Sequence, residues 1–190
     1  MTGFVRKHAW SLGLLVLFLI LLGTTKSIQP NFGASGLESL ARSALPFAFA
    51  TAGMAVVVIV GGIDLSVASM MSVCSVTAAV LMPEVGGITG IVIVLALGAA
   101  MGAINGGLIV VTKVPDIVVT LAMLFVWEGV ALLILSSPGG HIADWLQASI
   151  QGSAAIPGLP KAFLLVAILI GVIWIPIKRS KLGFSIYATG

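Results

Sequence analysis

The stretch VVIVGGIDLSVASM (57–70) joins two hydrophobic runs through two adjacent glycines, an aspartate and a serine. The flanking segments 43–63 and 65–83 carry no charged residue. Each is close to the length of about 20 apolar residues that a helix needs to cross a bilayer. The stretch therefore predicts a tight turn between two membrane-spanning helices, with Asp64 in the turn.

The composition places the chain in a membrane. Of its 190 residues, 59% are hydrophobic and only 8% are charged, and the mean hydropathy is +1.24. Soluble domains carry roughly 25% charged residues, so this chain lacks the polar surface that water requires. The net charge of +3 comes from few, scattered basic residues, which argues against nucleic acid as a partner. The single cysteine, Cys74, excludes a disulfide or a cysteine-based metal cluster within the chain.

The apolar segments predict an all-α, polytopic bundle of six membrane-spanning helices. Their expected ranges are about 9–25, 43–60, 65–82, 88–111, 117–135 and 161–177. The basic, apolar start is like that of a signal peptide, but no cleavage site of small residues follows Leu22, so we expect an uncleaved first helix. Residues 1–190 are expected to form a single transmembrane domain.

The distribution of lysine and arginine predicts the orientation, because basic residues favour the cytoplasmic side of a membrane. If both termini are cytoplasmic, the basic residues inside are Arg6, Lys7, Lys113, Lys178, Arg179 and Lys181. Those outside are Lys26, Arg42 and Lys161. The longest connecting segment, 136–160, is then external, and its stretch IADWLQASI (142–150) predicts a short helix at the membrane interface.

Small residues recur on one face of two predicted helices. Gly98, Gly102 and Gly106 are four residues apart, the spacing that lets two helices approach closely in a bilayer. The preceding helix carries a stripe of small side chains, made up of Ala68, Ser72, Ser75 and Ala79. Both faces predict ordinary helix packing inside a bundle.

The turn at 61–66 has two compatible interpretations. Gly61 and Gly62 suit the left-handed conformation that closes a helix. Asp64 or Ser66 suits the cap that accepts hydrogen bonds from the first N–H groups of the next helix. Irregular backbone at membrane depth is also found where it lines a water-filled cavity, as in the broken helices of transporters. In that second interpretation Asp64 also contacts a substrate or gates its route.

Three motifs resemble those of one family. GGIDLSVAS (61–69) resembles the signature of the permease subunits of bacterial ATP-binding-cassette importers for ribose, related monosaccharides and autoinducer-2, with Ala68 where that family commonly has glycine. GAINGGLIVVTKVPDIVVTLAML (102–124) is similar to the family's Asn-Gly, basic loop, proline and Thr-Leu helix. KRSKLGFSIYATG (178–190) is similar to its approach to the cytoplasmic coupling segment.

The resemblance implies a multi-pass permease of the bacterial inner membrane and a set of partners. These are cytoplasmic ATPase subunits, a periplasmic sugar-binding protein and a second permease copy or paralogue, all arranged in or on the lipid bilayer. The coupling approach would comprise Lys178, Arg179, Lys181, Tyr187 and Gly190. Family permeases are longer, with about ten spans by resemblance, so the chain is expected to be the N-terminal portion of one, without the second half.

The expected substrate pathway residues are Gly61, Gly62, Asp64, Ser66, Asn105 and Glu128. Glu128 lies near the middle of its span, where a charged carboxylate costs about 2.5–3.5 kcal/mol on insertion scales. It is therefore expected to face the bundle interior, to be protonated or to be paired, in either a functional or a structural role. The family commonly has a basic residue at this position, so no role transfers to Glu128. Asn105 suits a hydrogen bond to a neighbouring helix, and also a sugar contact.

The remaining polar residues suggest no chemistry. Lys113 and Asp116 flank Pro115 in a predicted cytoplasmic turn, where a solvated pair is expected. His141 and Asp144 have no third ligand nearby, so no metal site is expected. No P-loop, nucleophile elbow or metal-spaced histidine pair occurs, so no enzymatic activity and no cofactor are expected, and ATP would be hydrolysed by a separate subunit.

Two alternatives to an importer permease stand beside this interpretation. The chain would be half of a secondary carrier if Glu128 couples transport to a proton. It would be a truncated membrane fragment that moves nothing if no second half completes it. The identity of the solute depends on a few side chains that the sequence alone does not place in space.

Overall fold

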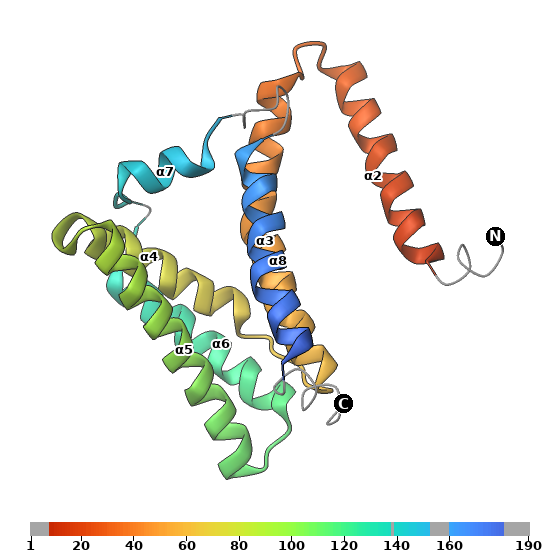
Figure 1. Ribbon diagram of the computed structural model, residues 1–190. Helices are drawn as coiled ribbons and strands as arrows, with labels where there is room; N and C mark the ends of the chain where they lie inside the picture. Colours follow the sequence, from red (N-terminus) through yellow and green to blue (C-terminus); the bar gives the residue numbers. More distant parts are fainter. Residues whose placement is uncertain (1–7, 138, 153–159, 181–190) are drawn as a thin grey trace.

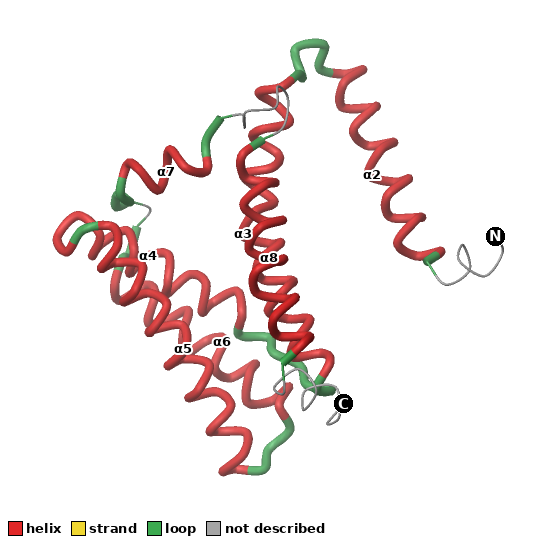
Figure 2. Tube along the Cα trace, in the orientation of Figure 1, coloured by secondary structure: helices red, strands yellow, loops and turns green. Residues whose placement is uncertain are grey.

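The computed structural model describes residues 8–137, 139–152 and 160–180, which form seven helices joined by turns and loops (Figures 1 and 2). The helices are α2 (Ala9–Ile28), α3 (Ala34–Ile59), α4 (Val67–Val85), α5 (Gly87–Thr112), α6 (Asp116–Ile134), α7 (Asp144–Ile150) and α8 (Lys161–Arg179). The predicted all-helical class is confirmed, and so is the short helix in the segment 136–160, which is α7.

The long helices form two groups. α4 packs against α5 and α6, and α3 lies side by side with α8, while α2 stands apart (Figure 1). The short helix α7 lies between these groups: it contacts α8, and its Trp145 lies against Gly87 at the start of α5. The α3–α4 turn joins the two groups.

Among the described residues, five helices, α2 to α6, are long and apolar enough to cross a membrane. α8 covers the range of the sixth expected span, and its crossing remains a prediction. α3 begins at Ala34, ahead of the expected membrane span at 43–60, so the residues before that span are helical as well. A helix needs apolar residues only inside the bilayer, and its hydrogen bonds continue through the polar residues of the segment 34–42.

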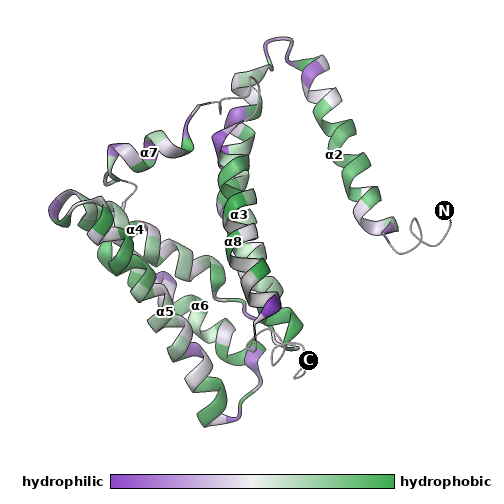
Figure 3. Cartoon of the chain, in the orientation of Figure 1, coloured by the Kyte–Doolittle hydropathy of each residue, from purple (hydrophilic) through white to green (hydrophobic). Residues whose placement is uncertain are grey.

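The described residues bury little and expose much apolar surface, as helices in lipid do. The central cluster consists of Val73, Met101 and Ala131, one from each helix of the α4–α5–α6 group. Outside it, apolar side chains line the long helices on their open faces, while polar residues gather at helix ends and turns (Figure 3). None of the residues of α2 is buried.

The glycine ridge of α5 is divided between packing and open space. An ideal Cβ added at Gly98 would lie 3.6 Å from the Cys74 sulfur of α4. Gly102 lies near Met70, which is also on α4. Gly106, one turn further, has nothing within 4 Å among the described residues. Gly98 and Gly102 therefore lie on the face that α5 turns toward α4.

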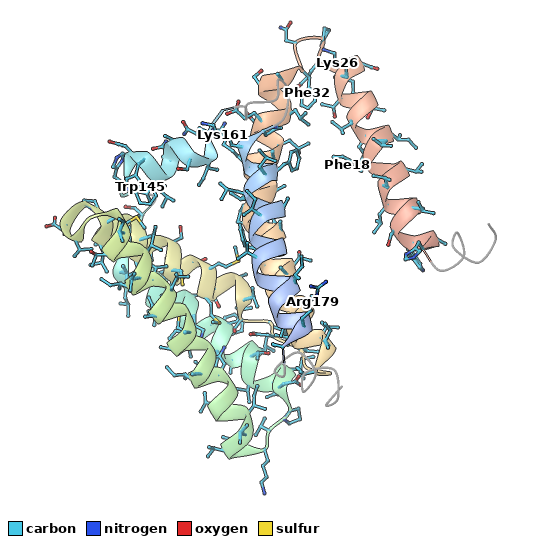
Figure 4. The ribbon with its side chains drawn as sticks, in the orientation of Figure 1. Phe18, Lys26, Phe32, Trp145, Lys161 and Arg179 are labelled. Carbon is cyan, nitrogen blue, oxygen red and sulfur yellow. The ribbon has the colours of Figure 1, made fainter. Side chains whose placement is uncertain are left out.

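Basic residues lie at helix ends. Lys26 lies near the α2–α3 turn, and Lys161 and Arg179 lie at the two ends of α8 (Figure 4). Lys26 Nζ donates to the carbonyl groups of Pro30 (2.8 Å) and Phe32 (2.6 Å), which close the turn between α2 and α3. The division of these residues between the two sides of the membrane remains a prediction. The cytoplasmic placement of both termini remains a prediction.

Candidate functional site

The turn between α3 and α4 begins with a two-bond helix cap. The Gly61 N–H donates to the Val58 carbonyl and the Gly62 N–H to the Val57 carbonyl, both at 3.0 Å. Gly61 has φ 79°, the left-handed conformation that this cap requires and that glycine adopts without steric cost. The predicted role of the glycine pair in closing the helix before the turn, α3, is confirmed.

Asp64 folds back onto the residue that starts the next helix. Its Oδ1 accepts hydrogen bonds from the Ser66 N–H (2.8 Å) and the Ser66 hydroxyl (2.6 Å). Ser66 is the N-cap of α4, but its side chain makes no capping hydrogen bond. The expected cap is therefore wrong for Ser66. Asp64 instead accepts from the N–H of Ser66 itself, at the start of α4, and the polar groups of the turn are satisfied locally as expected.

A buried chain of hydrogen bonds links this turn to two other helices. Asn105 Nδ2 on α5 donates to the Ser66 hydroxyl oxygen at 2.7 Å. The Trp127 indole N–H on α6 donates to Asn105 Oδ1 at 3.1 Å. Ser66 is 0% and Asn105 3% exposed, and each is satisfied by protein partners, as buried polar groups require. Sequence analysis gave Asn105 two interpretations, a hydrogen bond to a neighbouring helix and a sugar contact. The structure shows the first of these.

α6 holds the turn from a second direction. Asp116 Oδ2 accepts a hydrogen bond from the Ile63 N–H at 2.5 Å, and Thr120 Oγ1 lies 3.3 Å from the Ile63 carbonyl oxygen. Asp116 is half-buried. The expectation of a solvated pair between Lys113 and Asp116 is wrong for Asp116, because the first turn of α6 lies beside the α3–α4 turn and its carboxylate faces an unpaired backbone donor.

A cavity of about 650 Å³ opens between α3 and α4 beside Asp64. One wall comes from the stripe on α4, including Ala68, Ser72 and Ser75, and the other from Phe47, Thr51 and neighbouring residues of α3. A second hollow of about 450 Å³ also includes Ser75 and continues along Ala79 to Ser136 and Ser137. The small residues that were expected to pack against a helix line these two hollows instead.

The other expected site residues lie in different places. Glu128 is exposed on α6, away from the turn. Lys178 and Arg179 end α8, whereas Lys181, Tyr187 and Gly190 lie outside the described residues. The His141 ring nitrogen lies 3.0 Å from Asp144 Oδ1 on the surface. Among the described residues, no three His, Cys, Asp or Glu side chains gather closely enough to hold a metal ion.

Comparisons with known proteins give this architecture a family. The fold and the cavity define a polytopic helical membrane protein with a polar turn between two spans. Residues 36–190 match the family described as the permease component of branched-chain amino acid transport systems, and the chain belongs to that family. No solved structure matches the chain.

Curated relatives cover nearly the whole chain. It is 28% identical to the ribose import permease protein RbsC of Escherichia coli K12, over 93% of this chain and 56% of the relative. It is 30% identical to the probable ABC transporter permease protein y4mJ of Sinorhizobium fredii, over 94% and 53%. It is 28% identical to the autoinducer 2 import system permease protein LsrD of Escherichia coli O157:H7, over 97% and 58%.

The chain thus spans little more than half the length of these relatives, which are transport permeases. Together with its apolar helices, the relationship identifies a multi-pass protein of a bacterial inner membrane.

Proposed function

We propose that the chain forms part of the translocation pathway of an ATP-driven importer for a sugar or a similar polar solute. The observation that carries the proposal is the position of Asp64, whose carboxylate lines the 650 Å³ cavity between two membrane-spanning helices. Polar, irregular backbone between two spans lines the solute route in the broken helices of many transporters. The import functions named for the relatives support the class of solute.

The cavity offers hydrogen-bonding groups suited to a solute rich in hydroxyls. Asp64 Oδ1 is occupied by Ser66, and within the described part of the chain Oδ2 accepts no hydrogen bond. An ionised carboxylate has about four lone-pair sites, so Oδ2 remains available to a solute hydroxyl. Thr51 and Ser72 donate to carbonyls of their own helices, which leaves their oxygen lone pairs as acceptors toward the cavity.

The remaining expected residues receive indirect roles. Gly61 and Gly62 shape the turn, and Ser66 and Asn105 fix Asp64 from behind the cavity wall. Glu128 is a pathway residue in the proposal only where another part of the transporter covers the exposed face of α6. An isolated charge facing lipid is otherwise unfavourable, and such residues almost always face protein or water.

The proposed partners follow from the family. ATP hydrolysis takes place on separate cytoplasmic ATPase subunits, a periplasmic binding protein delivers the solute, and a second permease copy or paralogue completes the pathway. The segment from Lys178 to Gly190 leads toward the coupling region. In this proposal residues 1–190 are the N-terminal transmembrane portion of such a permease, and no cofactor is needed.

Uptake measurements test the proposal. The full native coding region is expressed with its ATPase and binding protein in a bacterium that lacks its own ribose permease, and uptake of labelled ribose and autoinducer 2 is followed. The Asp64→Ala variant is expected to lose about 90% of uptake at an unchanged membrane level, equivalent to about 1.4 kcal/mol. Asp144→Ala, on the exposed α7, is the control and keeps wild-type uptake. Wild-type uptake in Asp64→Ala would remove the basis of the proposal.

The source of energy is tested in the same cells. Deletion of the ATPase is expected to abolish uptake, and an uncoupler that leaves ATP levels intact is expected to have little effect. The opposite pattern would favour the proton-coupled carrier and would direct attention to Glu128.

A further inference from the structure

One residue of the α3–α4 turn is contacted by α6 at both of its backbone groups. The Ile63 N–H donates to Asp116 Oδ2 at 2.5 Å. The Thr120 hydroxyl donates to the Asp116 carbonyl at 2.8 Å, and its oxygen also lies 3.3 Å from the Ile63 carbonyl oxygen. Asp116 and Thr120 are four residues apart in the first turn and a half of α6, so they lie on one face of that helix. Thr120 is fully buried at this contact.

The Asp116 hydrogen bond fixes the peptide plane before Ile63, and the longer Thr120 contact lies at the plane after it. The N–H belongs to the peptide that joins Gly62 to Ile63, and the carbonyl belongs to the peptide that joins Ile63 to Asp64. A peptide plane is rigid, so holding the plane before Ile63 limits the backbone rotation that directs the Asp64 side chain. The Ser66 contact then fixes the carboxylate itself.

Asp116 is suited to this task by its position as well as by its charge. Its Oδ1 accepts from the Ile117 N–H at 2.9 Å, which orients the carboxylate at the start of α6. The positive end of the helix dipole favours a negative charge there. The carboxylate therefore makes a charge-assisted hydrogen bond to Ile63, which is stronger than a bond between neutral groups.

We propose that Asp116, together with Thr120, is a positioning residue that holds the Asp64 turn in register with α6. We call the contacts of Asp116 and Thr120 with Ile63 the clamp. Its role in transport rests on the proposed function of Asp64, but its existence as a structural contact does not. Neither side chain lines the 650 Å³ cavity, so both act through the turn and not by touching solute.

Hydrogen exchange of the turn amides tests the clamp directly. The full chain is placed in lipid nanodiscs, and deuterium uptake is measured for the peptide that contains residues 61–66. Asp116→Ala is expected to speed exchange at Ile63 about tenfold, the effect of losing one charged hydrogen bond. Asp116→Asn keeps an acceptor oxygen and is expected to restore most of the protection. Thr25→Val, which removes a hydroxyl bonded to the Leu21 carbonyl within α2, is the control for Thr120→Val.

Uptake in single and double variants tests the action through Asp64. If Asp116 only positions Asp64, Asp116→Ala combined with Asp64→Ala loses no more uptake than Asp64→Ala alone. An additive loss would overturn the assignment of Asp116 as a residue that acts through Asp64. Unchanged exchange at Ile63 in both Asp116→Ala and Thr120→Val would overturn the clamp, whatever happens to uptake. Wild-type uptake in Asp64→Ala, by contrast, would overturn the proposed function and leave the exchange result standing.

Discussion

At the scale of single residues, Gly61 has a backbone conformation that glycine adopts without steric cost. Its φ of 79° is in the left-handed region, where a side chain costs about 1–2 kcal/mol. We expect Gly61→Ala to lower the thermal unfolding temperature of the detergent-solubilised protein. Gly53→Ala, within α3 and with open space around the added Cβ, is the matched control and is expected to be neutral or stabilising. Equal loss in both variants would assign the effect to α3 and not to the turn.

Asn105 is the second residue with a large expected effect. Replacement by alanine leaves the Trp127 N–H without its acceptor and removes the donor to Ser66. An unsatisfied buried polar group costs about 1–3 kcal/mol, and we expect a loss of this size for Asn105→Ala in denaturant titrations. Asn31→Ala, at an exposed position in the α2–α3 turn, serves as the control. A change below about 0.5 kcal/mol, the usual size for surface substitutions, would contradict the network.

Residue-level prediction from the sequence succeeded only where the determinant is local. The glycine pair and the aspartate predicted a turn because the helix cap depends on neighbouring residues. The clamp on Ile63 was missed because Asp116 is 53 residues away and α6 meets the turn only in the folded molecule. Asn105 was predicted as one of two interpretations for the same reason: its partner, Ser66, is 39 residues away.

At the scale of elements, the apolar runs predicted the helices well but not what their faces contact. The stripe on α4 has the spacing of a packing face, yet it lines two hollows. Small side chains permit a close neighbour and also leave room for a cavity. Their spacing does not distinguish the two, because the outcome depends on where α3 lies.

Ser75 is the element-level test of the cavity, because it borders both hollows. A leucine there fills the junction, and we expect Ser75→Leu to reduce uptake at least about tenfold, an effect of about 1.4 kcal/mol, without reducing insertion. Ala99→Leu, on the exposed face of α5, adds the same kind of bulk outside the hollows and is expected to be tolerated. Uptake that falls equally in both variants would argue against a route along α4.

At the scale of the whole molecule, the orientation remains to be measured. The positive-inside rule predicts that Lys113 is cytoplasmic and Lys26 external. In a Cys74→Ala background, a cysteine at position 26 is expected to react with a membrane-impermeant maleimide in intact spheroplasts, and a cysteine at position 113 only after permeabilisation. The reverse pattern would invert the topology and place the Asp64 turn at the other face of the membrane.

The order in which the helices contact one another also bears on how the chain is made. α4, α5 and α6 are consecutive, so their mutual contacts are available as soon as α6 has left the ribosome. The partner of α3 is α8, which is synthesised only after the long segment 136–160. During that interval α3 has no α8 to pack against, whereas α4, α5 and α6 can already pack together. Assembly is therefore staged, and the wall of the cavity that α3 supplies reaches its final support last.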